Sequence, residues 1–332
     1  MWKLLAQLNK NLIIALPIMM ILGFIYGILL PTAFMKHLIL PITFLMVYPM
    51  MVNLKVKKVL EGGDLKTQGF TQVINFLVIP FVALGLGLLF FENHPYMALG
   101  LVLTGLIPTS GMTISWTGLA KGNVEAAIKM TVIGLILGTL AAPLYLRFLM
   151  GTELDINTAA IIKQMALIVF LPFMAGFGTR QLLIKKLGME RFQKELAPRF
   201  PVLSLLGVLG IVFMAVALKA KMIAANPGLI LYILVPLLIF YLLNYTVGTI
   251  VGKLFLPKGD SIALVYGSVM RNLSIALAIA LNAFGPEGST AALVVAVAFI
   301  IQVQSAVWYS KFIPRIYATE TKATGKTLET AS

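Results

Sequence analysis

The sequence contains no cysteine among its 332 residues. Disulfide bonds, thiolate metal sites and cysteine nucleophiles are therefore excluded. The two histidines, His37 and His94, lie far apart in predicted loops or helix ends and make a poor metal or proton-relay set. The phosphate-binding loop, the dinucleotide-binding fingerprint and the zinc motifs are also missing. We therefore expect neither an enzyme nor a bound cofactor or metal.

Charge is scarce as well. Only 11% of the residues are charged, against about a quarter in a soluble domain, whereas 60% are hydrophobic and the mean hydropathy is +0.97. These values indicate an all-α protein that crosses the lipid bilayer several times. The net charge of +14 would suggest nucleic-acid binding in a soluble protein. Here most cations lie in short loops beside apolar segments, so no nucleic-acid partner is expected.

Long apolar runs predict ten transmembrane helices, each near the ~20 residues that a bilayer requires. Lysine and arginine concentrate in loops on the side of the N-terminus, which predicts a multi-pass protein of the cell inner (plasma) membrane with both termini in the cytoplasm. The first apolar run is too long for a signal peptide and has no small-residue cleavage site. The predicted helices are residues 12–30, 37–52, 70–91, 96–120, 124–150, 156–178, 201–218, 227–251, 261–284 and 289–312.

The two halves of the chain resemble each other. Proline positions in the first and sixth predicted helices coincide when the halves are aligned, superposing Pro17 on Pro172. Residues 1–150 and 151–312 are therefore predicted to form two five-helix repeats, inverted relative to each other because each contains an odd number of spans. The polar residues 313–332 are predicted to be a disordered cytoplasmic tail.

Two apolar segments are interrupted by polar residues at matching places in the two halves. The interruptions are residues 108–111 in the fourth predicted helix and residues 270–274 in the ninth. Non-helical backbone at membrane depth persists only where protein or a watery cavity satisfies its polar groups. A pair of broken helices in corresponding positions predicts the substrate site of a secondary transporter.

The first interruption combines a helix breaker with hydroxyl groups. Pro108 removes a backbone donor and Gly111 permits unusual dihedral angles, so the helix can stop there. Thr109, Ser110 and Thr113 then place hydroxyls beside freed carbonyls, and the following half-helix directs its positive N-terminus at the bilayer centre, which favours an anion. Alternatively, these hydroxyls bond to preceding carbonyls and only kink the helix.

The second interruption carries Arg271 between two apolar runs. An arginine at the bilayer centre costs several kcal/mol, so it is expected to face a cavity or a partner. Its planar guanidinium could bind an anionic substrate, with Asn272 and Ser274 completing the site. Alternatively, Arg271 is a structural charge that pairs with Glu125 or with carbonyls of the other interruption.

A few further polar residues lie within the predicted helices. Glu125 and Lys129 are four residues apart on one helix face. They form either a neutralising pair or a site where Glu125 titrates as a proton-coupling carboxylate. Asn75 is a plausible substrate ligand, whereas Gln302 and Gln304 are expected to bridge helices.

Both interruptions resemble motifs of a known superfamily, which joins bile acid:sodium symporters and arsenical-resistance permeases. The stretches that carry this resemblance are PTSGMTISWTGLAKGNVEAAI and MRNLSIALAIAL, and MVYPMMVNLKVKKV resembles the arsenical-resistance branch. The resemblance covers nearly the whole chain. It implies a ten-span inverted-repeat fold, with a core domain around crossed helices 4 and 9 and a panel domain of spans one, two, six and seven.

The resemblance also implies two sodium sites around the crossed helices, and the chain keeps only part of them. Thr113 and Thr131 retain hydroxyls and Asn75 retains an amide, which makes Thr131 a candidate coupling residue. Arg271 replaces a glutamine, and Gly267 stands where a glutamate is expected. A guanidinium in a sodium site should repel sodium and could itself replace the cation, so sodium dependence is not expected.

The arsenical-resistance branch would place a reactive cysteine where Thr109 stands and a carboxylate where Ser274 stands. Thiolate ligation of arsenite is therefore impossible in this chain.

The residues and the resemblance together predict a secondary transporter that moves a small organic anion by alternating access. The alternatives are an arsenite or oxyanion efflux permease with altered ligands and a sodium-coupled bile-acid-type symporter. A channel would require a continuous polar path through the membrane, and the sequence shows only two local polar interruptions.

Overall fold

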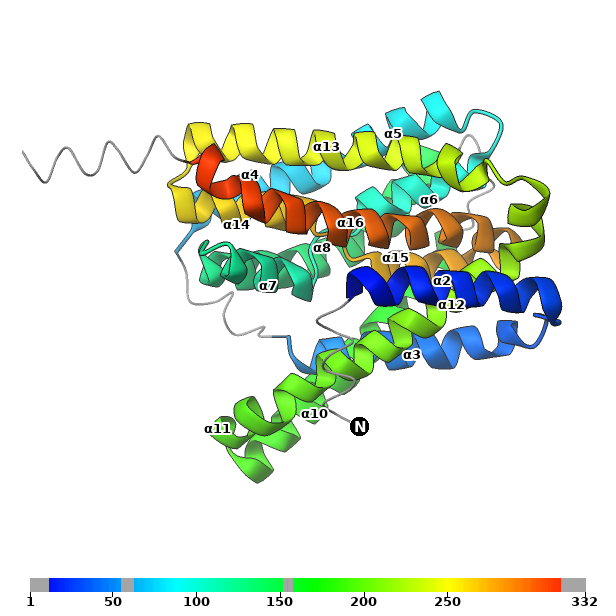
Figure 1. Ribbon diagram of the computed structural model, residues 1–332. Helices are drawn as coiled ribbons and strands as arrows, with labels where there is room; N and C mark the ends of the chain where they lie inside the picture. Colours follow the sequence, from blue (N-terminus) through cyan, green and yellow to red (C-terminus); the bar gives the residue numbers. More distant parts are fainter. Residues whose placement is uncertain (1–11, 55–62, 152–153, 155–157, 318–332) are drawn as a thin grey trace, which may run out of the picture.

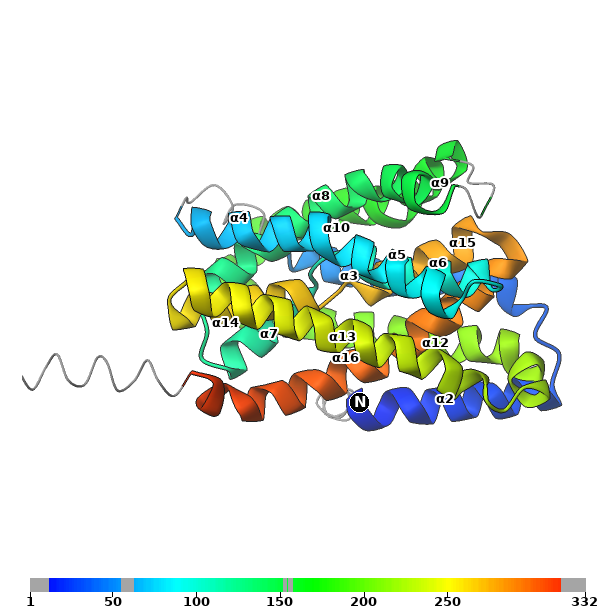
Figure 2. The same cartoon turned by 90° about the horizontal axis from the view of Figure 1, so that it is seen from above.

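The computed structural model describes residues 12–54, 63–151, 154 and 158–317. Within these residues the secondary structure is helical and no strand occurs, which confirms the predicted all-α class. The long helices run roughly side by side along one direction of the bundle (Figure 1, Figure 2). In chain order the elements are α2 (Leu12–Leu29), α3 (Met35–Val52), α4 (Leu65–Val73), η2 (Ile74–Val78), α5 (Ile79–Phe90), α6 (Pro95–Leu106), α7 (Gly111–Leu119), α8 (Val124–Met150), α9 (Thr158–Met165), η3 (Ala166–Phe170), α10 (Leu171–Leu187), α11 (Met189–Arg191), η4 (Phe192–Leu196), η5 (Ala197–Arg199), α12 (Phe200–Ala225), α13 (Leu229–Phe255), α14 (Lys258–Val269), α15 (Leu273–Ala283), η6 (Gly285–Glu287) and α16 (Gly288–Ile316).

The described residues include eight helices that are long and apolar enough to cross a membrane, or nine if the bent pair α6–α7 counts as one span. Helix α2 is also apolar, but its stretch Ile14–Leu29 is shorter than the helices counted as possible membrane spans. Several membrane crossings are therefore confirmed, while the number ten, the inverted repeats and the division into core and panel domains stay predictions. Residues 318–332, most of the predicted tail, lie outside the described part, and α16 continues to Ile316.

Helices α2, α3, α10 and α12 pack against one another through close backbone approaches. A Cβ atom at Gly207 of α12 would lie 2.5 Å from the backbone nitrogen of Met46 in α3. A Cβ at Gly176 of α10 would lie 2.8 Å from Cβ of Met51, also in α3. Small residues thus allow these membrane helices to approach closely, as is usual where lipid replaces water.

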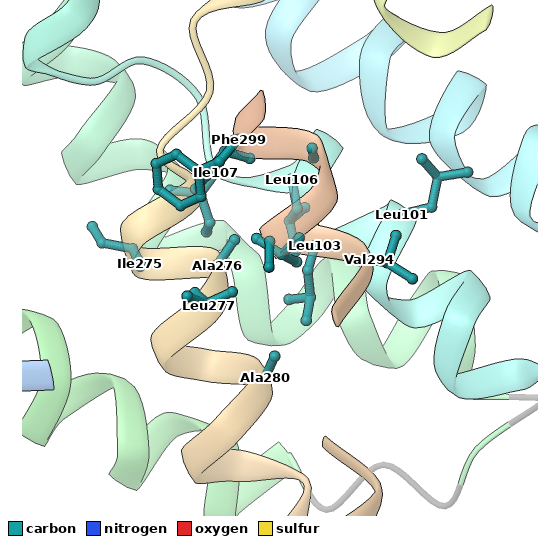
Figure 3. Close-up of a cluster of buried hydrophobic side chains, with 14 of the residues drawn as sticks. Leu101, Leu103, Leu106, Ile107, Ile275, Ala276, Leu277, Ala280, Val294 and Phe299 are labelled. Atoms are coloured by element: carbon teal, nitrogen blue, oxygen red, sulfur yellow. The ribbon is translucent and has the colours of Figure 1, made fainter. Parts of the chain in front are cut away.

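The buried centre of the remaining helices forms where α6, α15 and α16 meet. Figure 3 shows Leu103 and Leu106 of α6 beside Ala276 and Ala280 of α15, with Val294 of α16 next to them. These side chains are fully buried. The alanines of the sequence LSIALAIAL therefore serve helix packing, and they hold the two broken helices in fixed relation.

Two helices contain wide π-helical turns directly before a proline. The turn η2 precedes Pro80 of α5, and η3 precedes Pro172 of α10. Proline lacks an N–H and its ring clashes with a preceding carbonyl, and a π turn absorbs this disruption without ending the helix. Asn75 lies within η2, where it is fully buried.

The basic segment 180–200 forms a hairpin. Helix α10 continues through Gly178 to Leu187, and the chain reverses at Gly188, which has φ of +82°. The short elements α11, η4 and η5 then lead back into α12. Figure 1 shows α10 and α11 projecting from the bundle.

Candidate functional site

The two helix interruptions meet inside the bundle. The N–H of Asn272 donates to the carbonyl of Ile107 at 2.9 Å, and the hydroxyl of Thr113 lies 3.5 Å from the carbonyl of Met270. Helices α6 and α7 are bent by 59° at the first interruption. The polar backbone groups released by each break are thus partly satisfied by the other break, as the absence of water at membrane depth requires.

The first interruption is seated against α8. Thr109 has φ of +57° and is fully buried, and its hydroxyl donates to the carbonyl of Pro108 at 2.8 Å. A Cβ at Gly138 of α8 would lie 2.6 Å from Cδ of Pro108, and one at Gly134 would lie 2.6 Å from Oγ1 of Thr109. The hydroxyl of Thr109 is therefore engaged with backbone, as the alternative interpretation of these hydroxyls expected.

The half-helix α7 starts with a capping box. The hydroxyl of Ser110 accepts from the N–H of Met112 at 3.2 Å, and the N–H of Ser110 donates to the hydroxyl of Thr113 at 3.3 Å. At the second interruption, Oδ1 of Asn272 accepts from the N–H of Ile275 at 3.2 Å and caps α15. Each cap fixes the helix start that lies at the meeting point of the breaks.

The Arg271 side chain is buried between the two breaks and is only 1% exposed. Its Nη1 donates to Oδ1 of Asn75 at 2.5 Å and to the carbonyl of Ser268 at 3.1 Å, and its Nη2 donates to the carbonyl of Gly105. Among the described residues Arg271 forms no ion pair, and Nε has no hydrogen-bond partner. The predicted alternative of pairing with Glu125 is wrong, whereas contact with a carbonyl of the other broken helix is confirmed.

Gln302 of α16 holds the backbone of the second interruption. Its Oε1 accepts from the N–H of Arg271 at 2.8 Å and from the hydroxyl of Tyr241 at 3.1 Å, and its Nε2 donates to the carbonyl of Arg271 at 3.2 Å. The prediction that Gln302 bridges helices is confirmed. Its attachment to Arg271 was not predicted, because 31 residues separate the two in sequence.

A cavity of about 340 Å³ lies beside the meeting point. One wall consists of the two interruptions and α8, and the opposite wall comes from α3 and α12. The predicted residues Thr109, Ser110, Gly111, Thr131, Arg271, Asn272 and Ser274 line it. Absent from the lining are Thr113, Asn75, Glu125 and Lys129. Thr113 contacts the backbone of both breaks, and Asn75 accepts a hydrogen bond from Arg271. The other lining residues are Met50, Asn53, Leu54, Met112, Ile114, Ser115, Ile128, Val132, Leu135, Pro201, Ser204, Leu205, Val208, Leu273, Phe299 and Gln302.

Lys129 belongs to a separate polar cluster at the start of α4, α8 and α14. Its Nζ lies 3.2 Å from Oδ2 of Asp64 and 3.9 Å from Oε1 of Glu125, so Asp64 is the nearer partner. Nδ2 of Asn123 donates to Asp64 at 3.2 Å and to Asp260 at 2.6 Å. Glu125 is 54% exposed on its side chain. The local pairing of Lys129 with Glu125 is confirmed, but the sequence pattern missed Asp64, which precedes a different helix.

No group of three or more His, Asp or Glu side chains among the described residues is arranged to hold a metal ion.

An all-helical fold with several membrane crossings, and two broken helices that meet beside a cavity, is the arrangement of a membrane transporter. Comparison with known proteins gives the family. The model of the sodium bile acid symporter family matches residues 38–226, and the chain belongs to this family.

Among its relatives are two arsenical-resistance proteins Acr3. The protein from Alkaliphilus metalliredigens is 26% identical over 270 residues, which cover 76% of this chain and 75% of the relative. The protein from Corynebacterium glutamicum is 22% identical over 259 residues, covering 74% and 70%. An uncharacterised transporter from Synechocystis is 26% identical over 286 residues, covering 78% and 73%.

Proposed function

We propose that this chain is a secondary transporter that moves a small organic anion across the cell inner membrane by alternating access, without sodium. The observation that carries the proposal is the state of Arg271. Arg271 lines the 340 Å³ cavity, its guanidinium forms no ion pair among the described residues, and Nε has no hydrogen-bond partner.

The charge of Arg271 supports an anionic substrate. The guanidinium donates to three neutral oxygens, namely an amide oxygen and two backbone carbonyls. These contacts satisfy donors but leave the positive charge uncompensated, and burying an uncompensated charge is costly. An anion in the cavity would supply the missing charge, and an oxygen of that anion would accept from Nε. The N-termini of α7 and α15 add positive partial charge at the same place.

The remaining lining supports an organic rather than an inorganic anion. Met50 of α3 and Leu205 and Val208 of α12 form an apolar wall opposite the breaks. Ser110 and Ser274 add hydroxyls beside Arg271. The volume lies within the range of about 300–1,000 Å³ that is typical of small-molecule sites. A small anion with an apolar part would match both walls.

The proposed independence from sodium also follows from the contacts of Arg271. Amide and carbonyl oxygens are ligands that a bound sodium ion would use. In this chain the guanidinium occupies the oxygens of Asn75, Ser268 and Gly105. A fixed positive charge at this place would repel a second cation.

Alternating access would require the two walls of the cavity to move relative to each other. The wall of α3 and α12 belongs to the closely packed group α2, α3, α10 and α12, whereas the other wall consists of the breaks and α8. We propose that the first group rocks against the second around the site. We propose Glu125, Lys129 and Thr131 as coupling residues, with Glu125 as the carboxylate that would carry a proton. Of these three residues, Thr131 lines the cavity.

A second candidate is an arsenite or oxyanion efflux permease, which is favoured by the two relatives named arsenical-resistance proteins. Because the chain has no cysteine, such a protein would have to hold the arsenical through hydroxyls and Arg271. Arsenious acid is mostly uncharged at neutral pH and would gain little from the charge of Arg271.

The test is thermal unfolding of the purified protein with acetate, benzoate, methanesulfonate, taurocholate or arsenite, each with sodium or with choline as the cation. A ligand at 100 times its Kd stabilises by about 2.7 kcal/mol. We expect at least one organic anion to stabilise the protein equally in both salts. Stabilisation by arsenite alone would favour the second candidate, and stabilisation that requires sodium would contradict the cation argument.

A further inference from the structure

We propose that Gln302 and Tyr241 act as positioning residues, which place the guanidinium of Arg271 at the cavity by holding its backbone. This inference rests on the proposed anion site. It assigns part of the affinity of that site to Gln302, which lines the cavity and also holds the backbone of Arg271, and to Tyr241, which is absent from the lining.

The need for such a holder comes from the break itself. Between α14 and α15, Arg271 is the residue whose N–H and carbonyl take part in no helical hydrogen bond. Met270 still donates to the carbonyl of Tyr266, and Asn272 donates to Ile107 of the other break. Arg271 lies between them, and its N–H reaches the carbonyl of Val269 only through a tight three-residue turn at 2.9 Å. Its own carbonyl would be unsatisfied in a membrane interior, where such groups are costly.

The side-chain amide of Gln302 forms hydrogen bonds with both the N–H and the carbonyl of Arg271. It accepts from the N–H of Arg271 and donates to the carbonyl of the same residue, at 2.8 and 3.2 Å. These two hydrogen bonds fix the orientation of the Arg271 backbone as well as its position. Gln302 is 1% exposed, so its amide is held within packed helices. The backbone of Arg271 is thereby tied to α16.

Tyr241 completes the arrangement from α13. Its hydroxyl donates to Oε1 of Gln302 at 3.1 Å, and the ring is 1% exposed. Oε1 thus accepts two hydrogen bonds, which uses both lone pairs of an amide oxygen. This fixes the amide in the orientation that matches Arg271. Because Nε2 also donates to the carbonyl of Arg271, the amide of Gln302 is tied to that residue at both of its polar atoms.

The consequence lies at the other end of the Arg271 side chain. Nη1 and Nη2 contact Asn75, Ser268 and Gly105, while Nε is unpartnered. Arg271 lines the cavity, and its Nη1 and Nη2 atoms are held by hydrogen bonds. A shift of the Arg271 backbone would therefore change the position of Nε relative to the cavity. Gln302 should therefore affect the affinity for an anion through the position of Arg271, and because Gln302 also lines the cavity, the test has to separate this effect from a direct contact with the anion.

The experiment is a double-mutant cycle with Gln302→Met and Arg271→Gln, which measures the Kd of the best-binding anion among acetate, benzoate, methanesulfonate and taurocholate. Methionine keeps the length of glutamine and removes its polar atoms. Gln304→Met is the matched control, since Gln304 lies on the same helix, is only partly buried and forms no side-chain hydrogen bond within the described part of the chain. Melting temperature is recorded for every variant, because a purely structural role would lower it equally for the free and the ligand-bound protein.

We expect Gln302→Met to weaken binding about tenfold in the wild-type background and less than twofold in the Arg271→Gln background, whereas Gln304→Met leaves binding unchanged. A tenfold loss in both backgrounds would show that Gln302 acts independently of Arg271 and would overturn the inference, as would an unchanged Kd. Should Gln302→Met fail to fold, Tyr241→Phe is expected to weaken binding by severalfold, and no effect of this change would also overturn it. If the folded wild type binds none of the anions, the proposed function itself fails.

Discussion

Replacement of Arg271 by glutamine tests the proposed site most directly. The change removes the buried positive charge and the Nε donor at the cavity, and it leaves the backbone attachment to Gln302 in place. A hydrogen bond that involves a charged group contributes about 1.5–3 kcal/mol. Loss of one such bond should weaken the binding of an anion by about 10- to 150-fold.

The effect on folding should be much smaller than the effect on binding. The guanidinium gives up hydrogen bonds to Asn75, Ser268 and Gly105, which stabilise the fold. It also gives up the desolvation cost of a buried charge, and replacing buried ionic groups is often neutral for this reason. In addition, the oxygens that the guanidinium occupied become available, so sodium should stabilise the variant but not the wild type.

The assay is isothermal titration of the detergent-purified protein with the best-binding anion, in sodium and in choline salts. Arg271→Lys separates charge from geometry, because lysine keeps a positive charge but has no Nε fork, and its affinity should fall between the other two. Arg191→Gln is the matched control, since Arg191 is exposed on the hairpin and its ion pair among the described residues is with Glu195. Unchanged affinity in Arg271→Gln, together with continued indifference to sodium, would refute the reasoning.

Two further predictions concern residues outside the cavity lining, namely Lys129 of the separate polar cluster and Gly138, which packs on the first break. Lys129→Met should destabilise the protein by about 1–2 kcal/mol, which is less than the loss of a fully buried ion pair would cost, because Asp64 is 20% exposed. In the control Lys194→Met, which removes an exposed pair with Glu190, stability should change by less than about 0.5 kcal/mol. Equal effects of the two changes in chemical unfolding would contradict a stabilising role for the pair of Lys129 and Asp64. Gly138→Ala should lower stability by about 1–3 kcal/mol, because the added Cβ would lie 2.6 Å from Cδ of Pro108. Gly85→Ala, where a Cβ would meet nothing within 4 Å, should be neutral or slightly stabilising, and a Gly138 variant with an unchanged melting temperature would show that the first break is not seated on α8.

The fold could be predicted where local signals are strong. Helix α8 has the predicted bounds, because Asn123 caps its start and the apolar run is continuous. Helix α10 was predicted to end at Gly178, but it continues to Leu187, because a glycine inside a helix costs only about 1 kcal/mol. The π turn around Asn75 had no sequence signal apart from the proline that follows it.

The candidate site divides in the same way. That the two breaks carry the site residues was readable, because proline, glycine and a buried arginine interrupt apolar runs. The partners of those residues were not readable, because they depend on contacts between distant segments. The carbonyl of Gly105 reaches Arg271 across 166 residues, and Asp64 reaches Lys129 across 65. A backbone carbonyl also has no identity in a sequence, so no pattern could select Gly105.

The hairpin of α10 and α11 offers a practical handle for experimental imaging of this small membrane protein. Its tip at Gly188 is exposed, has φ of +82° and would accept an added Cβ without a clash from neighbouring atoms. Helix α10 reaches this tip without interruption from Leu171, and Figure 1 shows it standing clear of the bundle. A small rigid domain inserted at Gly188 would therefore move with α10 and with α3, on which α10 packs. Particle images of such a fusion would report the tilt of that helix group directly, with and without a bound anion.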